Sequence, residues 1–272
     1  ANGTVRQVLG NPYGGSLPEG AGGLATSRDG RLVAIGGSEG RVQLWDWADN
    51  SLWRELPGPV DVLEYGWYGY APPVASVDLA PDGSAAAAGL DDGTILFWEI
   101  GESTRLQVLS PSRSATGFRP TVAFSPDGQV LAAAYSMTVR LWRTADRTPL
   151  KALEEHTDWI TDLAFSPDGR LLATGAQRDG VFLWRMPEGT LLRKVETEGR
   201  GTVAVTFSPD GQILATGSFD GLVQLWRVAD DTLLRTLVGH TQWPQGLAFS
   251  PDGRMLGTTS SDGTIRLWGV VR

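Results

Sequence analysis

Short apolar runs alternate with turn signals along the chain. Within residues 203–238, four runs rich in β-branched, aromatic or aliphatic residues predict four strands, at Val203–Phe207, Ile213–Ser218, Leu222–Trp226 and Leu233–Val238. Between the first two, Ser208-Pro209-Asp210-Gly211 indicates a type I turn, because Pro presets φ at the second position and Gly favours the fourth. The next turn contains Phe219-Asp220-Gly221, where Gly allows a positive φ. The pattern therefore predicts a four-stranded antiparallel sheet.

The same pattern recurs along the chain. Residues 165–184, FSPDGRLLATGAQRDGVFLW, nearly repeat residues 207–226, FSPDGQILATGSFDGLVQLW. Each of six copies ends its third predicted strand on a Trp, at Trp45, Trp98, Trp142, Trp184, Trp226 and Trp268. The steps between these Trp residues are 53, 44, 42, 42 and 42 residues. Four strands per repeat of this length is typical of a propeller blade, since one sheet alone cannot bury both of its faces. The sequence thus predicts an all-β, six-bladed β-propeller.

The units resemble WD40 repeats. The stretch HTDWITDLAFSPDGRLLATG at 156–175 looks like the bacterial branch of that family, and the likeness covers nearly the whole chain in six registered copies. The Trp-Asp pair of the family is kept only at Trp45-Asp46, whereas Trp98 is followed by Glu and the other four by Arg or Gly. The turn residues, which carry the fold, are unaffected by that loss.

The two ends of the chain predict how the propeller closes. TVRQVLG at 4–10 matches the fourth-strand pattern TLLRTLVG at 232–239, and the sixth unit ends just after its third strand. We therefore expect residues 4–10 to complete the last blade, which would hide the sheet edges of an open array. This makes residues 1–272 a single closed domain, expected to be monomeric. The chain starts without an initiator Met, so we expect it to be a piece of a longer protein.

The resemblance implies a hydrogen-bonded His, Ser/Thr, Asp and Trp set inside a blade. Unit six has all four members. Unit four has three of them, because its Asp179 is displaced by one position and Arg178 stands where the Asp is expected. Unit five has Glu198 where the His would stand. The residues carried over are His240, Thr258, Asp262 and Trp268 in unit six, and His156, Thr174 and Trp184 in unit four. We interpret these sets as structural, because a buried Trp donor without a partner costs about 1–3 kcal/mol.

Composition and charge exclude several classes of protein. A net charge of −8 argues against binding to nucleic acid, which usually requires a basic face. No run of 18 apolar residues is present, so we predict no membrane span. The chain has no Cys, which removes disulfide and thiolate chemistry but fits either side of a membrane. A cytoplasmic location is favoured.

No motif predicts catalysis, a cofactor or a metal site. The only two His residues are assigned to the blade sets, which removes the commonest base and metal ligand. GGSEG at 36–40 matches a G-x-S-x-G nucleophile motif around Ser38, but it lies in a predicted strand–strand turn with no following helix. Asp91-Asp92 and Asp230-Asp231 could hold a weak cation, yet solvated turns explain them more simply.

The aromatic residues that the blades do not need gather on one predicted face. In a sheet of four antiparallel strands, the second-to-third-strand turn and the connection to the next sheet emerge at the same end. These segments hold Tyr65, Trp67, Tyr68, Tyr70, Phe118, Tyr135, Trp159, Phe219 and Trp243. Large aromatic side chains on a loop-rich face are typical of binding surfaces. The densest part, YGWYGYAPP at 65–73, accounts for most of the extra length in the first repeat step, so it either binds or fills a gap between blades.

Two function classes follow. The first is a non-catalytic scaffold or recognition module that binds a protein or peptide, within a larger bacterial signalling or regulatory protein as the resemblance implies. The alternative is a small-ligand receptor or enzyme that uses the mouth of the central channel. The missing catalytic motifs favour the first.

Overall fold

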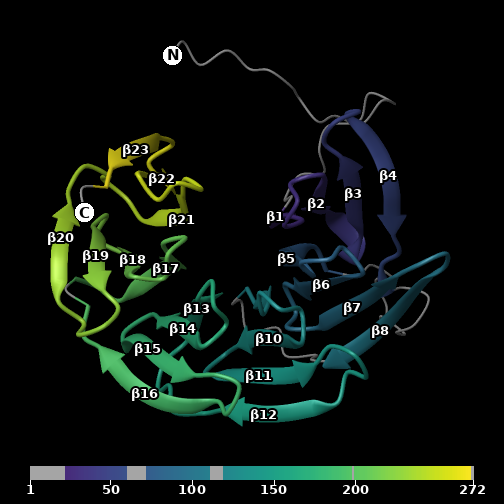
Figure 1. Cartoon of the computed structure of the whole chain (residues 1–272), viewed down its shortest axis with the longest axis horizontal. Helices are drawn as coiled ribbons and strands as arrows, with labels where there is room; N and C mark the ends of the chain where they lie inside the picture. The colour runs from purple at the N-terminus through teal and green to yellow at the C-terminus, as the bar shows by residue number, and fades with distance from the viewer. Residues whose placement is uncertain (1–21, 60–71, 111–118, 198, 271–272) are drawn as a thin grey trace. The chain divides into compact units, whose positions relative to one another are not determined.

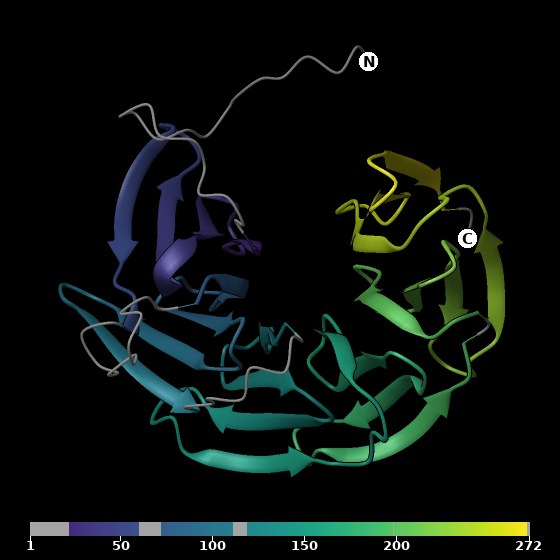
Figure 2. The ribbon, with the colours of Figure 1, turned by 180° about the vertical axis from the view of Figure 1, so that it is seen from behind.

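The computed structural model describes residues 22–59, 72–110, 119–197 and 199–270. The chain divides into two compact units, residues 1–122 and residues 123–272. The strands form six antiparallel sheets, each built from strands that follow one another along the chain (Figure 1; seen from behind in Figure 2). The predicted all-β, six-bladed propeller fold is confirmed.

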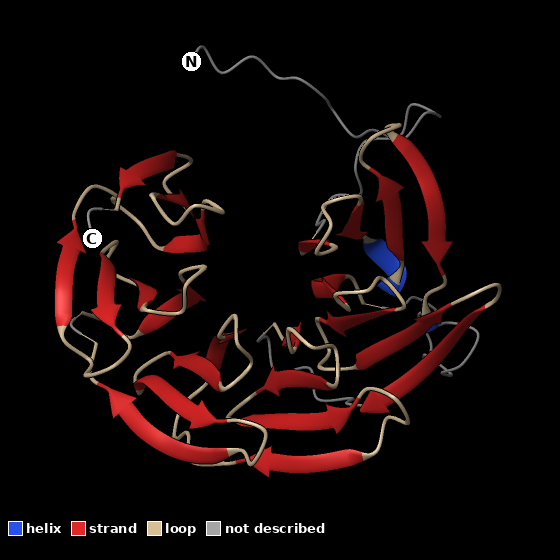
Figure 3. Cartoon of the chain, viewed as in Figure 1, coloured by secondary structure: helices blue, strands red, loops and turns tan. Residues whose placement is uncertain are grey.

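The first unit holds two four-stranded sheets. The first sheet is formed by β1 (Leu24–Thr26), β2 (Leu32–Gly36), β3 (Val42–Asp46) and β4 (Ser51–Leu56). The second is formed by β5 (Val74–Leu79), β6 (Ala85–Leu90), β7 (Ile95–Ile100) and β8 (Thr104–Ser110). A 3-10 turn, Ser38–Gly40, joins β2 to β3 and is drawn in blue in Figure 3.

The remaining four sheets follow in chain order, and the boundary between the two units runs through β9. The third sheet is β9 (Thr121–Phe124), β10 (Val130–Tyr135), β11 (Thr138–Arg143) and β12 (Pro149–Leu153). The fourth is β13 (Ile160–Phe165), β14 (Leu171–Ala176), β15 (Gly180–Arg185) and β16 (Thr190–Val195). The fifth is β17 (Thr202–Phe207), β18 (Ile213–Ser218), β19 (Val223–Arg227) and β20 (Leu233–Leu237), and the sixth is β21 (Pro244–Phe249), β22 (Met255–Ser260) and β23 (Ile265–Gly269).

The Ser-Pro-Asp-Gly turns form by local hydrogen bonding. At the β13–β14 turn, the Gly169 N–H donates to the Ser166 carbonyl over 2.8 Å, and Gly169 has a φ of 70°. The Ser166 hydroxyl donates to the Asp168 carboxylate over 2.6 Å and accepts from the Leu171 N–H over 2.9 Å. The same bonds recur in other sheets, at Ser125, Ser208 and Ser250. Because each turn satisfies its own polar groups, the strands on either side start in a fixed register.

The core lies between facing sheets. In the second unit, Ala173, Leu183 and Val195 of the fourth sheet share one buried cluster with Phe207 and Trp226 of the fifth. In the first unit, the Trp98 indole N–H donates over 2.9 Å to the carbonyl of Pro57, which follows β4. The second, fourth and fifth sheets thus bury their third-strand Trp against the preceding sheet, which is why one unit of the repeat cannot stand alone.

The sixth sheet has three strands among the described residues. Ile265 and Leu267 on β23 are 75% and 72% exposed, whereas their counterparts on β19, Val223 and Leu225, are 0% and 4% exposed because they pack against Leu256 and Val270 of the sixth repeat unit. The segment expected to complete this sheet, residues 4–10, lies outside the described residues. Closure of the propeller by that segment therefore stays a prediction.

Candidate binding face

In the second unit, the turns between second and third strands and the connections between sheets lie at the same ends of the strands. The Gln177 N–H of the β14–β15 turn donates to the Trp159 carbonyl over 2.9 Å, and the Ser261 N–H donates to the Trp243 carbonyl over 3.1 Å. We call this surface the loop face. Its segments are residues 136–137, 154–159, 177–179, 196–197, 199–201, 219–222, 238–243 and 261–264.

A hydrogen-bonded set fixes the loop face at the sixth sheet. His240, in the connection before β21, contacts the Thr258 hydroxyl through Nε2 at 2.7 Å and the Asp262 carboxylate through Nδ1 at 2.9 Å. The Trp268 indole N–H donates to the same Thr258 oxygen over 2.9 Å. A hydrogen bond from the Thr264 hydroxyl holds the pKa of Asp262 well below its usual range. Partial burial acts in the opposite direction, and the hydrogen bond with His240 lowers the pKa further. Asp262 therefore stays ionised and ties the connection to the β22–β23 turn.

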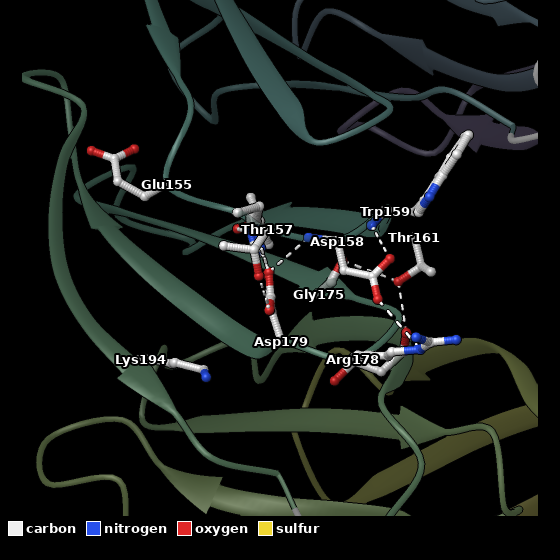
Figure 4. A network of polar contacts seen from close by, with 12 residues as sticks. Glu155, Thr157, Asp158, Trp159, Thr161, Gly175, Arg178, Asp179 and Lys194 are labelled. Atoms are coloured by element: carbon white, nitrogen blue, oxygen red, sulfur yellow. Dashed lines mark hydrogen bonds and ion pairs between the residues drawn. The ribbon is translucent and has the colours of Figure 1, made fainter.

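The fourth sheet has an equivalent set that uses Asp179. His156 Nε2 lies 2.6 Å from the Thr174 hydroxyl, to which the Trp184 indole N–H also donates over 2.8 Å. Asp179 accepts the Thr157 N–H over 2.6 Å and lies 3.5 Å from His156 Nδ1 (Figure 4 shows the neighbouring contacts). The displacement of this Asp in the sequence therefore does not remove it from the site. In the fifth sheet, Trp226 donates to Thr216 over 3.0 Å, and Glu198 lies outside the described residues.

Burial sets the charge state of His156. Its ring is stacked on Phe182, with ring centroids 4.1 Å apart, and burial lowers its pKa below the ordinary value despite the neighbouring Asp179. Although burial opposes them, hydrogen bonds from Thr157 hold the pKa of Asp179 below its usual range. Protonation of His156 therefore favours the unfolded chain, in which an imidazole has a pKa of about 6.5.

This shift predicts a pH dependence. Stability linked to His156 is fully present above pH ~6.5 and is lost as the pH falls below that value. We expect the His156→Gln variant to lose less unfolding free energy than the wild type between pH 7 and pH 5. Asp179 and Asp262 titrate below this range and leave the difference unaffected. Guanidinium unfolding at both pH values measures it, and equal losses in the two proteins would contradict the assignment.

The predicted aromatic residues fall into four groups. Phe219 and Trp243 lie together, with ring centroids 5.3 Å apart, and Trp243 is 46% exposed. Tyr135 lies instead under Arg140, whose guanidinium carbon is 5.3 Å from the ring centroid. Trp159 is half-buried, and its side chain extends away from the Asp179 contacts in Figure 4. The remaining predictions, Tyr65, Trp67, Tyr68, Tyr70 and Phe118, lie outside the described residues.

A hollow of about 400 Å³ opens beside Phe219. Its lining comes from the β14–β15 turn, the connection before β17 and the β18–β19 turn. The lining residues are Gln177, Arg178, Gly199, Arg200, Gly201 and Phe219. The two arginines are not among the predicted site residues, because that prediction is based on surplus aromatic residues and not on charge. In the sequence, Arg178 stands out only because it occupies the position where the repeat pattern has an Asp.

Other candidate chemistry is accounted for by turns. Ser38 lies in the short turn before β3, so a strand rather than a helix follows it. Among the described residues, no group of three His, Cys, Asp or Glu side chains could hold a metal ion. In that same part of the chain, no helix is long and apolar enough to cross a membrane.

The comparison with known families decides the identity of the repeat. A family model described as "WD domain, G-beta repeat" matches residues 63–99, 120–143, 147–185, 189–227 and 231–269, which is more than half of the chain. The chain belongs to the WD40 repeat family. The sheet β1–β4 lies outside the matched ranges, and its first turn has Arg28 in place of the usual Pro.

Individual WD40 proteins resemble parts of the chain. The small ribosomal subunit protein RACK1 of Schizosaccharomyces pombe is 31% identical over 42% of this chain and 38% of its own length. The protein LST8 homolog of Drosophila melanogaster is 27% identical over 56% of this chain and 47% of its own length. This WD40 chain thus matches less than half of the length of either relative. The curated relatives are mostly eukaryotic, so the predicted bacterial type is not confirmed.

A solved structure supports the fold alone. The β-propeller domain of Cps50 (Swd1) from Myceliophteria thermophila matches with a TM-score of 0.77 and 20% identity, over 92% of this chain and 84% of that one.

Proposed function

We propose that this WD40 chain is a non-catalytic module that binds a protein or peptide through its loop face. The observation that carries the proposal is the Phe219–Trp243 pair, which leaves a large aromatic surface exposed beside a hollow. Exposed aromatic side chains next to a concave surface are the usual anchors of protein recognition.

The bonding beneath the loop face supports the same proposal. The sets around His156 and His240 tie the sheet connections to the turns of the same sheets. Loops held in this way lose little conformational freedom when a partner binds, which favours affinity. Tyr135 and Trp159 would extend the surface, and a binding role of the aromatic segment at 65–73 stays a prediction because its residues 65–71 lie outside the described ones. A larger bacterial signalling or regulatory parent protein is part of the proposal and rests on the repeat pattern alone.

Truncating the aromatic pair tests the proposed function. A phage-displayed library of random dodecapeptides is selected on the wild-type protein, and the selected peptides are measured by calorimetry. We expect the Phe219→Ala, Trp243→Ala double variant to weaken peptide binding by about 2–4 kcal/mol, the range of interface hot spots. Its melting temperature should change by only a few degrees, because neither residue belongs to the buried core between sheets.

The control replaces an aromatic residue of similar exposure elsewhere. Trp53 on β4 is 44% exposed and does not belong to the loop face, so Trp53→Ala should leave peptide affinity unchanged. Peptides that bind the double variant as tightly as the wild type would show that the loop face is not the binding surface.

A further inference from the structure

The hollow beside Phe219 is shaped by two glycines that cannot be replaced without a clash. Gly201 has a φ of 71°, and a Cβ at this position would collide with the carbonyl of Gln177. Gly199 has a φ of 105°, and its Cβ would lie 2.6 Å from the Asp220 carboxylate. Both positions require a residue without a side chain. The two glycines therefore fix the path of the backbone that lines the hollow.

The charged residues that line the hollow have one sign, and the carboxylates of Asp158 and Asp220 lie beside it. Its lining contains two arginines and no carboxylate, although the chain as a whole carries a net charge of −8. The Arg178 side chain is 85% exposed, and its ion pair with Asp158 is long, at 3.6 Å. Arg200 is exposed and forms no ion pair with any described residue. An incoming anionic group would meet the Arg200 guanidinium directly and would compete with Asp158 for that of Arg178.

An aromatic surface adjoins these charges. Phe219 forms part of the lining, and Trp243 lies against it with much of its ring exposed. Guanidinium groups bind carboxylates through charge-assisted hydrogen bonds, whereas aromatic rings bind apolar side chains. The hollow therefore offers a cationic contact and an apolar contact next to each other.

We propose that the hollow binds an acidic segment of the partner protein, with a carboxylate side chain between Arg178 and Arg200 and a neighbouring apolar side chain on Phe219 and Trp243. This inference rests on the proposed function and specifies the chemistry of the partner. The net negative charge of the chain repels acidic segments in general. A preference for them must therefore come from these two arginines.

Three capped pentapeptides serve as probes: Gly-Glu-Phe-Glu-Gly, its neutral form Gly-Gln-Phe-Gln-Gly, and Gly-Glu-Gly-Glu-Gly. Binding is followed by NMR on ¹⁵N-labelled protein, through the Trp243 indole N–H and the amides of Gly199 and Gly201. We expect the first peptide to bind about tenfold or more tightly than each of the other two, since hydrogen bonds to charged groups and aromatic contacts both contribute at this level.

Two variants separate local pairing from general electrostatics. In the Arg178→Gln, Arg200→Gln double variant, the preference should reverse and the neutral peptide should bind more tightly than the acidic one. The Arg170→Gln control removes an arginine of equal exposure, 84%, beside the β13–β14 turn outside the loop face, and should keep the wild-type preference. Melting temperatures of both variants should match the wild type.

Each other outcome overturns the inference. Equal affinity for the acidic and neutral peptides, or an unchanged preference in the double variant, would show that the arginines do not select the ligand. Absence of shifts on the loop face with all three peptides at about 5 mM would do the same. If library-selected peptides depend on Phe219 and Trp243 but not on acidic residues, the proposed function stands and only the acidic partner is wrong.

Discussion

Deleting residues 1–10 is expected to lower the melting temperature by roughly 10 °C or more. Among the described residues β23 is the last strand of its sheet, whereas β19, at the same place in the fifth sheet, pairs with β20. If residues 4–10 add the missing strand, they form hydrogen bonds with the open edge of β23 and bury an apolar side chain at Val8, which together is worth about 3–6 kcal/mol. In a chain of this size each kcal/mol shifts the melting temperature by about 2–4 °C. Differential scanning calorimetry measures the change.

Shorter changes show whether strand pairing is responsible. Deletion of residues 1–3 should have no effect, because the fourth-strand pattern begins at Thr4. Val8, which aligns with the buried Leu237 of β20, should tolerate Ile but not Asp. A full deletion that melts with the wild type would show that residues 4–10 do not complete the sixth sheet.

Truncation of a third-strand Trp should have a comparable effect. Trp184 is fully buried in a cluster with Leu141 and Leu153 of the preceding sheet. We expect Trp184→Ala to lower the unfolding free energy by about 3–5 kcal/mol, as for other large core truncations. Trp184→Phe keeps most of the packing but removes the indole donor to Thr174, so it should cost less, about 1 kcal/mol beyond the volume change. Urea unfolding compares the three proteins.

The exposed Trp243 supplies the matched comparison for this prediction. Trp243→Ala should lower the unfolding free energy by only about 1 kcal/mol, since nearly half of Trp243 is exposed. Equal losses at positions 184 and 243 would contradict the division of the Trp residues into core and surface sets.

Local chemistry explains why the strands could be predicted from the sequence. The predicted strand Ile213–Ser218 coincides with β18, and the predictions for its neighbours differ by one residue at one end from β17 and β20 and by one residue at both ends from β19. Each Ser-Pro-Asp-Gly turn closes through its own side chains, so its position depends on few distant contacts. In the first sheet, Arg28 replaces Pro, yet the Ser27 and Asp29 bonds form the same turn.

The details of the loop face depend on contacts between segments that are distant in the sequence. The hollow is formed where the turn at Arg178 meets the connection at Arg200 and the turn at Phe219, and no pattern within one repeat encodes that meeting. The position of Asp179 is another example. In sequence it is out of register, but the β14–β15 turn still brings its carboxylate to Thr157 and His156. Loop geometry, rather than residue spacing, decides which side chains come together.

Hydrogen–deuterium exchange with a library-selected peptide tests the loop face as the binding surface most directly. The peptide should slow exchange in the segments 177–179, 199–201, 219–222 and 238–243. The turns at the other ends of the same strands, 166–169 and 208–211, should exchange at unchanged rates. Protection confined to those turns, with none on the loop face, would contradict the account.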